Sequence, residues 1–61
     1  MTDKEKLFNL MDELHDFRES AILIGDTELI QQYNHDILFL YRVLRVLGIC
    51  QEYKLERLNI K

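Results

Sequence analysis

The chain has 61 residues, a formal net charge of −3 and a single cysteine, Cys50. A protein of this size usually needs disulfides, a bound metal or self-association to supplement its small core, and one cysteine excludes an internal disulfide. The acidic balance argues against non-specific binding of nucleic acid, which requires Lys and Arg to neutralise phosphates.

The first predicted element is a helix over about residues 3–24. Its start, Thr2-Asp3-Lys4-Glu5, matches a capping box, in which the Thr2 hydroxyl accepts a hydrogen bond from the backbone N–H of Glu5. Apolar residues then recur at steps of three and four, which places them on one helical face. We expect this seam to face a second helix; its members are Leu7, Leu10, Leu14, Phe17, Ala21 and Ile24.

A turn is expected at residues 25–26. Gly25 suits the left-handed position that ends many helices, and Asp26 or Thr27 can cap the helix that follows. That second helix is predicted over about residues 27–47, and two seams of matching length joined by a tight turn predict an antiparallel hairpin. The members of the second seam are Ile30, Tyr33, Ile37, Leu40, Leu44 and Leu47.

Gly48 interrupts the second seam, and the residues beyond it leave two interpretations open. They can form a short third helix over about residues 49–59, or they can extend the second helix with a kink. We therefore predict a single all-α domain over residues 1–61, a long antiparallel helical hairpin plus a short C-terminal helix or helical extension, which assembles into a helical bundle.

The second helix carries more apolar residues than one neighbouring helix can cover. Phe39, Val43, Val46 and Cys50 form a second line at steps of four, three and four. Three occupants can cover this line: the C-terminal tail, a second copy in a four-helix bundle, or a different protein. We favour a homodimer, with an interface made of Leu38, Phe39, Tyr41, Val43, Val46 and Cys50.

Charged residues provide two further candidate surfaces. Residues 1–40 hold nine acids and three bases, a balance of −6, whereas residues 41–61 hold two acids and five bases, a balance of +3. The acidic set is interpreted as a solvated face, or more sharply as contacts to a basic partner: Asp12, Glu13, Asp16 and Glu19. The basic set would contact nucleic acid or an acidic partner: Arg42, Arg45, Lys54 and Arg57.

No catalytic, cofactor or metal site is predicted. His15 and His35 could face each other across the hairpin, but both lie outside the apolar seams, which favours solvated surface. A metal site would need three or four converging ligands. Cys50 lies on an apolar line with no histidine nearby in sequence, so we expect a small buried hydrophobe rather than a nucleophile.

The function expected from these patterns is that of a small non-enzymatic regulatory or adaptor protein, acting through helix-mediated protein–protein interaction. The alternative is a nucleic-acid-binding helical-hairpin dimer that uses the basic C-terminal region. A single thiol is typical of a reducing compartment, and the longest uninterrupted apolar run, residues 37–41, is five residues long. We therefore expect a cytoplasmic protein with no membrane partner and no cofactor.

Overall fold

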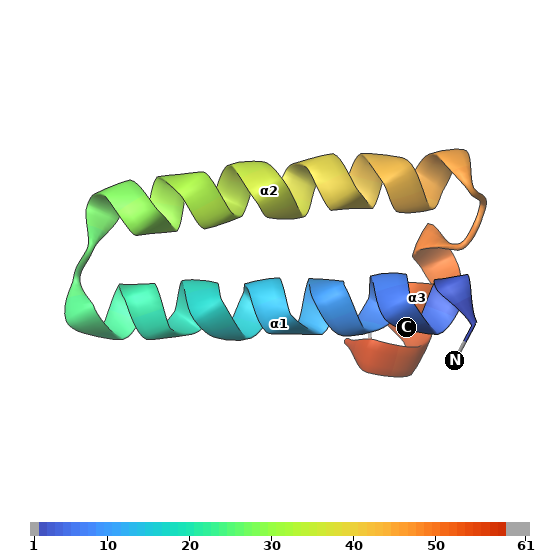
Figure 1. The fold of residues 1–61 in the computed structure, drawn as a ribbon, viewed down its shortest axis with the longest axis horizontal. Coiled ribbons are helices and arrows are strands. Elements are labelled where there is room, and N and C mark those ends of the chain that lie inside the picture. The colour runs from blue at the N-terminus through green and yellow to red at the C-terminus, as the bar shows by residue number, and fades with distance from the viewer. Residues whose placement is uncertain (1, 59–61) are drawn as a thin grey trace.

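The computed structural model describes residues 2–58, and that range contains three helices (Figure 1). Helix α1 spans Asp3–Ile24, α2 spans Thr27–Val46 and α3 spans Cys50–Arg57. α1 and α2 run antiparallel, and α3 folds back at the end of the hairpin where α1 begins and α2 ends (Figure 1). The predicted all-α hairpin with a short C-terminal helix is confirmed, and α3 is a separate helix rather than an extension of α2.

Side-chain caps begin both long helices. The Thr2 hydroxyl accepts a hydrogen bond from the backbone N–H of Glu5 at 3.2 Å, as the capping-box sequence predicts. At the start of α2, the Asp26 carboxylate accepts from the backbone N–H of Leu29, also at 3.2 Å. These bonds satisfy N–H groups that have no partner within the helix, and so they fix where each helix starts.

The turn between α1 and α2 is a Schellman motif. Gly25 adopts the left-handed conformation with φ 74°, and its N–H donates to the carbonyl of Ile22 at 3.1 Å. The N–H of Asp26 reaches back to the carbonyl of Ala21, also at 3.1 Å. This pair of bonds ends α1 and reverses the chain within two residues, which makes the hairpin tight.

The same motif recurs after α2 and directs the chain into α3. Gly48 has φ 76°, its N–H donates to the carbonyl of Arg45, and the N–H of Ile49 donates to the carbonyl of Leu44, both at 3.0 Å. The Ile49 side chain packs against the core cluster that contains Leu44, the apolar contact that commonly accompanies this motif. Because Gly48 turns the chain, α3 lies across the hairpin instead of prolonging α2.

The core lies where the three helices meet. Its largest fully buried side chains come from all of them: Phe8 and Met11 of α1, Leu44 of α2 and Tyr53 of α3. The rings of Phe8 and Tyr53 meet edge to face, with centroids 5.1 Å apart. Since α3 supplies one of these side chains, the core is complete only when α3 is docked.

The face that α1 turns to the core differs from the predicted seam. Phe8 and Met11, which are not seam members, are 1% and 0% exposed, whereas the seam residues Leu10 and Phe17 are 43% and 51% exposed. Ile24, the last seam residue, is 73% exposed. The predicted seam of α1 is therefore confirmed only in part: Ala21 is buried and Leu7 and Leu14 pack against the core cluster. The buried face is rotated toward Phe8 and Met11, because α3 covers that side of α1 and draws it into the core.

The seam of α2 keeps its predicted role over most of its length. Ile37 and Leu44 are buried, and the seam residues before and between them are half-buried. Leu47 is 57% exposed, because it follows the last residue of α2 and belongs to the turn at Gly48. Within residues 2–58, none of the helices combines the length and the apolar character that a bilayer span requires.

Candidate interaction surfaces

The position of α3 gives the hairpin a covered face and an open face. On the covered face, the Tyr53 ring contacts the rings of Phe8 and Tyr41, with centroids 5.1 and 6.1 Å apart. Successive residues of a helix are rotated by about 100° about its axis. Each long helix therefore has one flank beside its buried residues that faces α3 and an opposite flank that points away from α3. The resulting open face is apolar and consists of Leu7, Leu10, Leu14 and Phe17 of α1 and Tyr33, Leu40, Val43 and Leu47 of α2.

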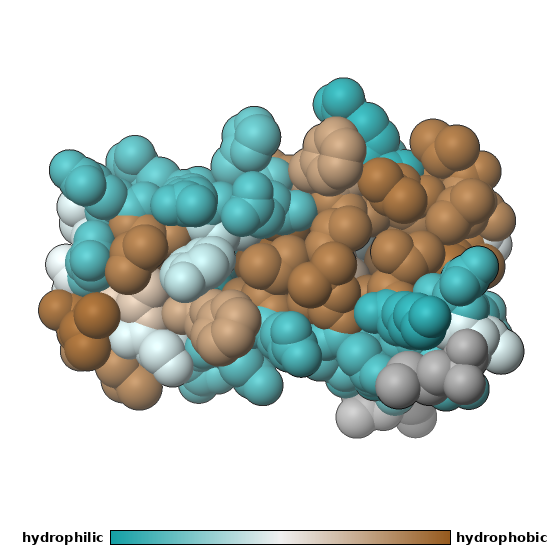
Figure 2. Space-filling view, viewed as in Figure 1, coloured by the Kyte–Doolittle hydropathy of each residue, from teal (hydrophilic) through white to brown (hydrophobic). Residues whose placement is uncertain are grey.

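Contacts and shape agree with this division. The rings of Phe17 and Tyr33 lie with centroids 6.0 Å apart and join the two helices at the edge of the open face. Figure 2 views the hairpin from the side away from α3 and shows hydrophobic atoms gathered over both helices, most densely toward the end where α1 begins. The open face is thus a continuous apolar surface shared by α1 and α2.

A second apolar surface lies on the exposed side of α2, and at Leu38 it reaches the groove between α2 and α3. Leu38, Phe39 and Val46 are 68%, 60% and 82% exposed there, and we call these three residues the outer ridge. Arg42 and His35 line a shallow hollow together with Leu38 and Phe39. The outer ridge is therefore apolar, with the Arg42 guanidinium at its edge.

Two of the six predicted interface residues are more buried than expected, although both line a groove between α2 and α3 together with Leu38. Cys50 is 9% exposed and belongs to the core, because the turn at Gly48 takes it off the α2 line and places it at the start of α3. Tyr41 is half-buried against Tyr53 and the core cluster. The expectation that Cys50 shares one exposed line with Phe39, Val43 and Val46 is corrected by the position of α3.

The other four predicted interface residues divide between two surfaces. Leu38, Phe39 and Val46 form the outer ridge, whereas Val43 is half-buried and belongs to the open face. The sequence pattern could not separate these two surfaces, because the spacing of apolar residues does not indicate which flank of α2 the third helix covers.

Asp12 and Arg57, predicted on opposite charged surfaces, pair with each other. Nη1 of Arg57 donates a hydrogen bond to Asp12 Oδ2. The same nitrogen donates a second hydrogen bond, 3.2 Å long, to the side-chain oxygen of Asn9. The hydroxyl of Tyr53 donates to Asp12 Oδ1 at 2.9 Å. Burial, followed by this hydrogen bond, raises the pKa of Tyr53 far above its usual value of 10.0. These groups hold α3 on α1, and their charges are largely engaged within the chain.

The remaining acidic residues of the predicted set, Glu13, Asp16 and Glu19, are exposed on α1. This placement agrees with a solvated face. Contact with a basic partner stays a prediction for these three residues.

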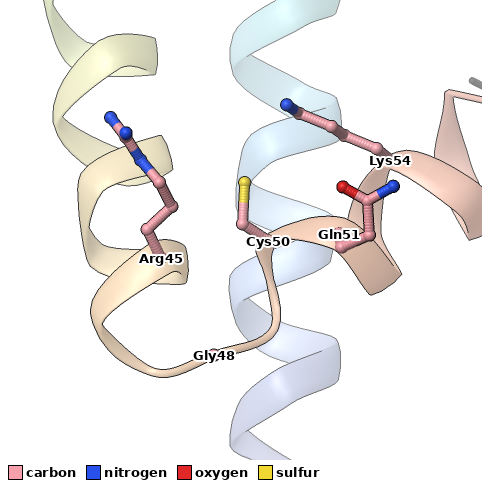
Figure 3. A pocket seen from close by; sticks show the side chains of 5 residues that line it. All are labelled: Arg45, Gly48, Cys50, Gln51 and Lys54. Atoms are coloured by element: carbon pink, nitrogen blue, oxygen red, sulfur yellow. The ribbon is translucent and has the colours of Figure 1, made fainter.

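The basic residues are only partly brought together. Arg45 of α2 and Lys54 of α3 line one groove of about 280 Å³, with the Cys50 thiol between them (Figure 3). Lys54 Nζ also lies over the Tyr41 ring, 6.0 Å from its centroid. Arg42 instead borders the outer ridge. Arg57 is engaged by Asp12, so two cations, rather than four, face the same groove.

The two histidines have different environments. His15 is half-buried with Nε2 3.3 Å from the Tyr41 hydroxyl, and burial, followed by the charge of Arg18, lowers the pKa of His15 from its usual value of 6.5. The solvated His15 expected from the sequence is therefore wrong. His35 is exposed, with Nδ1 3.9 Å from the neighbouring Asp36 carboxylate. Residues 2–58 contain no group of three or more His, Cys, Asp and Glu side chains placed to hold a metal ion.

Comparison with known proteins adds no assignment to these surfaces. Against family models, curated proteins and solved structures, no significant match to the chain is found.

Proposed function

We propose that this chain is a small non-enzymatic regulatory or adaptor protein that binds another protein through its helical surface, as a homodimer in the cytoplasm. The outer ridge gives the main support. Leu38, Phe39 and Val46 remain 68%, 60% and 82% exposed on a helix whose opposite side already closes a core. Clustered exposed side chains of this size are typical of interaction sites.

The ridge has the geometry that a partner helix requires. Phe39 and Val46 are seven residues apart, which is two helical turns or about 10.5 Å along α2. A partner helix can lay its own apolar positions along this line in the helix-in-groove mode. Arg42 borders the ridge, so the partner we propose has an apolar helical stripe with an acidic residue beside it.

The surroundings of the single thiol favour binding over chemistry. Cys50 lines the groove together with Arg45, Gly48, Gln51 and Lys54, and no histidine lines that groove. A thiol nucleophile usually acts beside a base that accepts its proton. We therefore assign no catalytic role to Cys50.

Site-specific photo-crosslinking in the producing cells tests the proposal. A photoreactive phenylalanine analogue at position 39 should crosslink one partner protein reproducibly, and Phe39→Glu with Val46→Glu should abolish binding of that purified partner. The matched control places the analogue at Leu23 and uses Leu23→Glu with Ile24→Glu, because these residues are 83% and 73% exposed but lie at the turn. Equal crosslinking at positions 39 and 23 would rule out a specific ridge partner.

A second candidate function is nucleic-acid binding, which the groove between Arg45 and Lys54 favours (Figure 3). A dimer would present two such grooves, and its affinity should fall steeply with salt because phosphate contacts release counterions. Fluorescence anisotropy with labelled RNA and DNA tests this candidate. Binding that survives Arg45→Gln with Lys54→Gln, or that does not change with salt, would exclude it.

A further inference from the structure

The open face leaves apolar side chains of both long helices without a cover. Leu10 and Leu47 are 43% and 57% exposed, and Leu7, Leu14 and Leu40 are half-buried against the core cluster. Val43 is half-buried between Leu40 and Leu47 on the same flank of α2. Figure 2 shows this surface as one hydrophobic area that spans α1 and α2.

We propose that the open face is the site where a second copy of this chain binds, so that two hairpins form a four-helix bundle with each α3 on the outside. This inference rests on the homodimer included in the proposed function and assigns it an interface. The interface differs from the six residues expected from the sequence, because only Val43 belongs to both sets.

Exposed area supports an occupant of this size. The chain exposes 4694 Å², whereas a compact monomer of 7.4 kDa is expected to expose about 4,200 Å². The molecule measures 33 by 24 Å across the open face, so a second hairpin of the same dimensions can lie along it without overhanging.

The shape of the face supports a second copy in particular. α1 and α2 have 22 and 20 residues, and each contributes an apolar line at steps of three and four. The lines are Leu7, Leu10, Leu14 and Phe17 on α1 and Leu40, Val43 and Leu47 at the end of α2. A two-fold rotation would place α1 of one copy on α2 of the other, so that each apolar line meets a line of similar length. In such a dimer the same residues are buried on both copies, so the interface needs no residue from a different protein.

A charged side chain on α2 limits how far the proposed dimer interface can extend along the hairpin. Asp36, whose side chain is 46% exposed, lies one turn before Leu40 on the same flank of α2. A carboxylate buried without a partner is costly, so the dimer contact should centre on the end of the hairpin where α1 begins. That is also the end where the hydrophobic atoms are densest in Figure 2.

Sedimentation equilibrium from 1 to 500 µM, with matched variants, tests the inference. The wild-type chain should be a dimer, and Leu10→Lys with Leu47→Lys should weaken association roughly 100-fold, because unpaired ammonium groups would be buried. Both residues are partly exposed in the lone chain, so the variant should keep its helical circular dichroism. The matched control, Phe39→Lys with Val46→Lys on the outer ridge, should remain a dimer.

Several outcomes would overturn the inference: a wild-type monomer at every concentration, a dimer that survives Leu10→Lys with Leu47→Lys, or a dimer broken by the ridge control. Isotope-filtered NOEs in a mixed labelled and unlabelled dimer give a test without variants. Val43 methyl groups should show contacts to the other copy, and Val46 methyl groups should not. A wild-type monomer whose ridge crosslinks a specific partner would disprove this interface yet leave the adaptor function standing.

Discussion

At the scale of single residues, Tyr53 joins the apolar core to the polar groups that hold α3 on α1. Its side chain is fully buried against the rings of Phe8 and Tyr41, and its hydroxyl reaches the partly exposed Asp12. Burial disfavours the phenolate, which is why the pKa of Tyr53 is raised. The same residue therefore contributes packing, a hydrogen bond and a dependence of stability on alkaline pH.

We expect Tyr53→Phe to lower the free energy of unfolding by about 1–2 kcal/mol, because Asp12 loses a hydrogen-bond donor while the ring remains. A group with a raised folded pKa stabilises the fold fully below its unfolded pKa, so the wild-type chain should lose stability as the pH rises above about 10. Urea unfolding at pH 7 and pH 10.5 measures both effects. Tyr33→Phe is the control, and an equal effect at Tyr33 would contradict the role of the Tyr53 hydroxyl.

His15 should give a pH dependence on the acidic side. Its folded pKa lies below 6.5, so the unfolded chain binds the proton first as the pH falls. The stability that the neutral imidazole contributes is thus complete above pH 6.5 and declines as the pH falls from there toward the folded pKa. Unfolding at pH 7.5 and 5.5 should show this decline in wild type and less of it in His15→Gln. A His15 ring signal that titrates at or above 6.5 by NMR would contradict the assignment.

At the scale of elements, local signals in the sequence predict where the helices begin and end. The Thr2 and Asp26 caps and the left-handed Gly25 act within four residues of the boundaries that they set, so they can be recognised without tertiary information. The rotation of α1 could not be recognised in this way. Phe8 and Met11 lie beside the predicted seam, and only the position of α3 decides which flank of α1 is buried.

The rotation of α1 can be tested by truncating one side chain on each flank. Met11→Ala should cost about 2–5 kcal/mol, because it opens a cavity at a fully buried position. Ile24→Ala, at a seam position that is 73% exposed, should cost less than about 1 kcal/mol. Thermal and urea unfolding at equal protein concentration compare the two variants. The reverse order of costs would restore the predicted seam.

The turn at Gly48 should tolerate only residues that accept the left-handed conformation. A Cβ at this position would meet no atom within 4 Å, so Gly48→Ala is expected to cost about 1–2 kcal/mol from backbone strain alone. Gly48→Asn should cost less, because asparagine adopts this conformation more readily. Gly25→Ala provides a second left-handed site for comparison. A more stable Gly48→Ala variant would show that the chain does not turn here as described.

At the scale of the whole molecule, the sequence indicates surplus apolar surface without assigning its occupants. The excess on α2 is visible in the residue pattern, and the structure divides it among the core beneath α3, the open face and the outer ridge. Tyr41 and Val43 show why this division was not predictable: they are two residues apart in sequence, yet one faces α3 and the other points away from it. Which of the two flanks α3 covers follows from the turn at Gly48.

If the open face binds a second copy, the thermal midpoint should depend on protein concentration. Association stabilises the folded state by mass action, so the midpoint should rise by several degrees between about 5 and 500 µM. Differential scanning calorimetry measures this shift, and Leu10→Lys with Leu47→Lys should remove it. A midpoint independent of concentration in the wild-type chain would argue against any dimer in this range.

The docked position of α3 also gives Cys50 a time-dependent accessibility. α3 has only eight residues and no side-chain hydrogen bond at its N-cap, so it is too short to be stable once it leaves the hairpin. Its detachment should be a local opening that requires less free energy than unfolding of the hairpin. Cys50 is 9% exposed in the groove between α2 and α3, so each opening of the third helix should raise the rate at which a disulfide reagent modifies the thiol above the rate of the docked state.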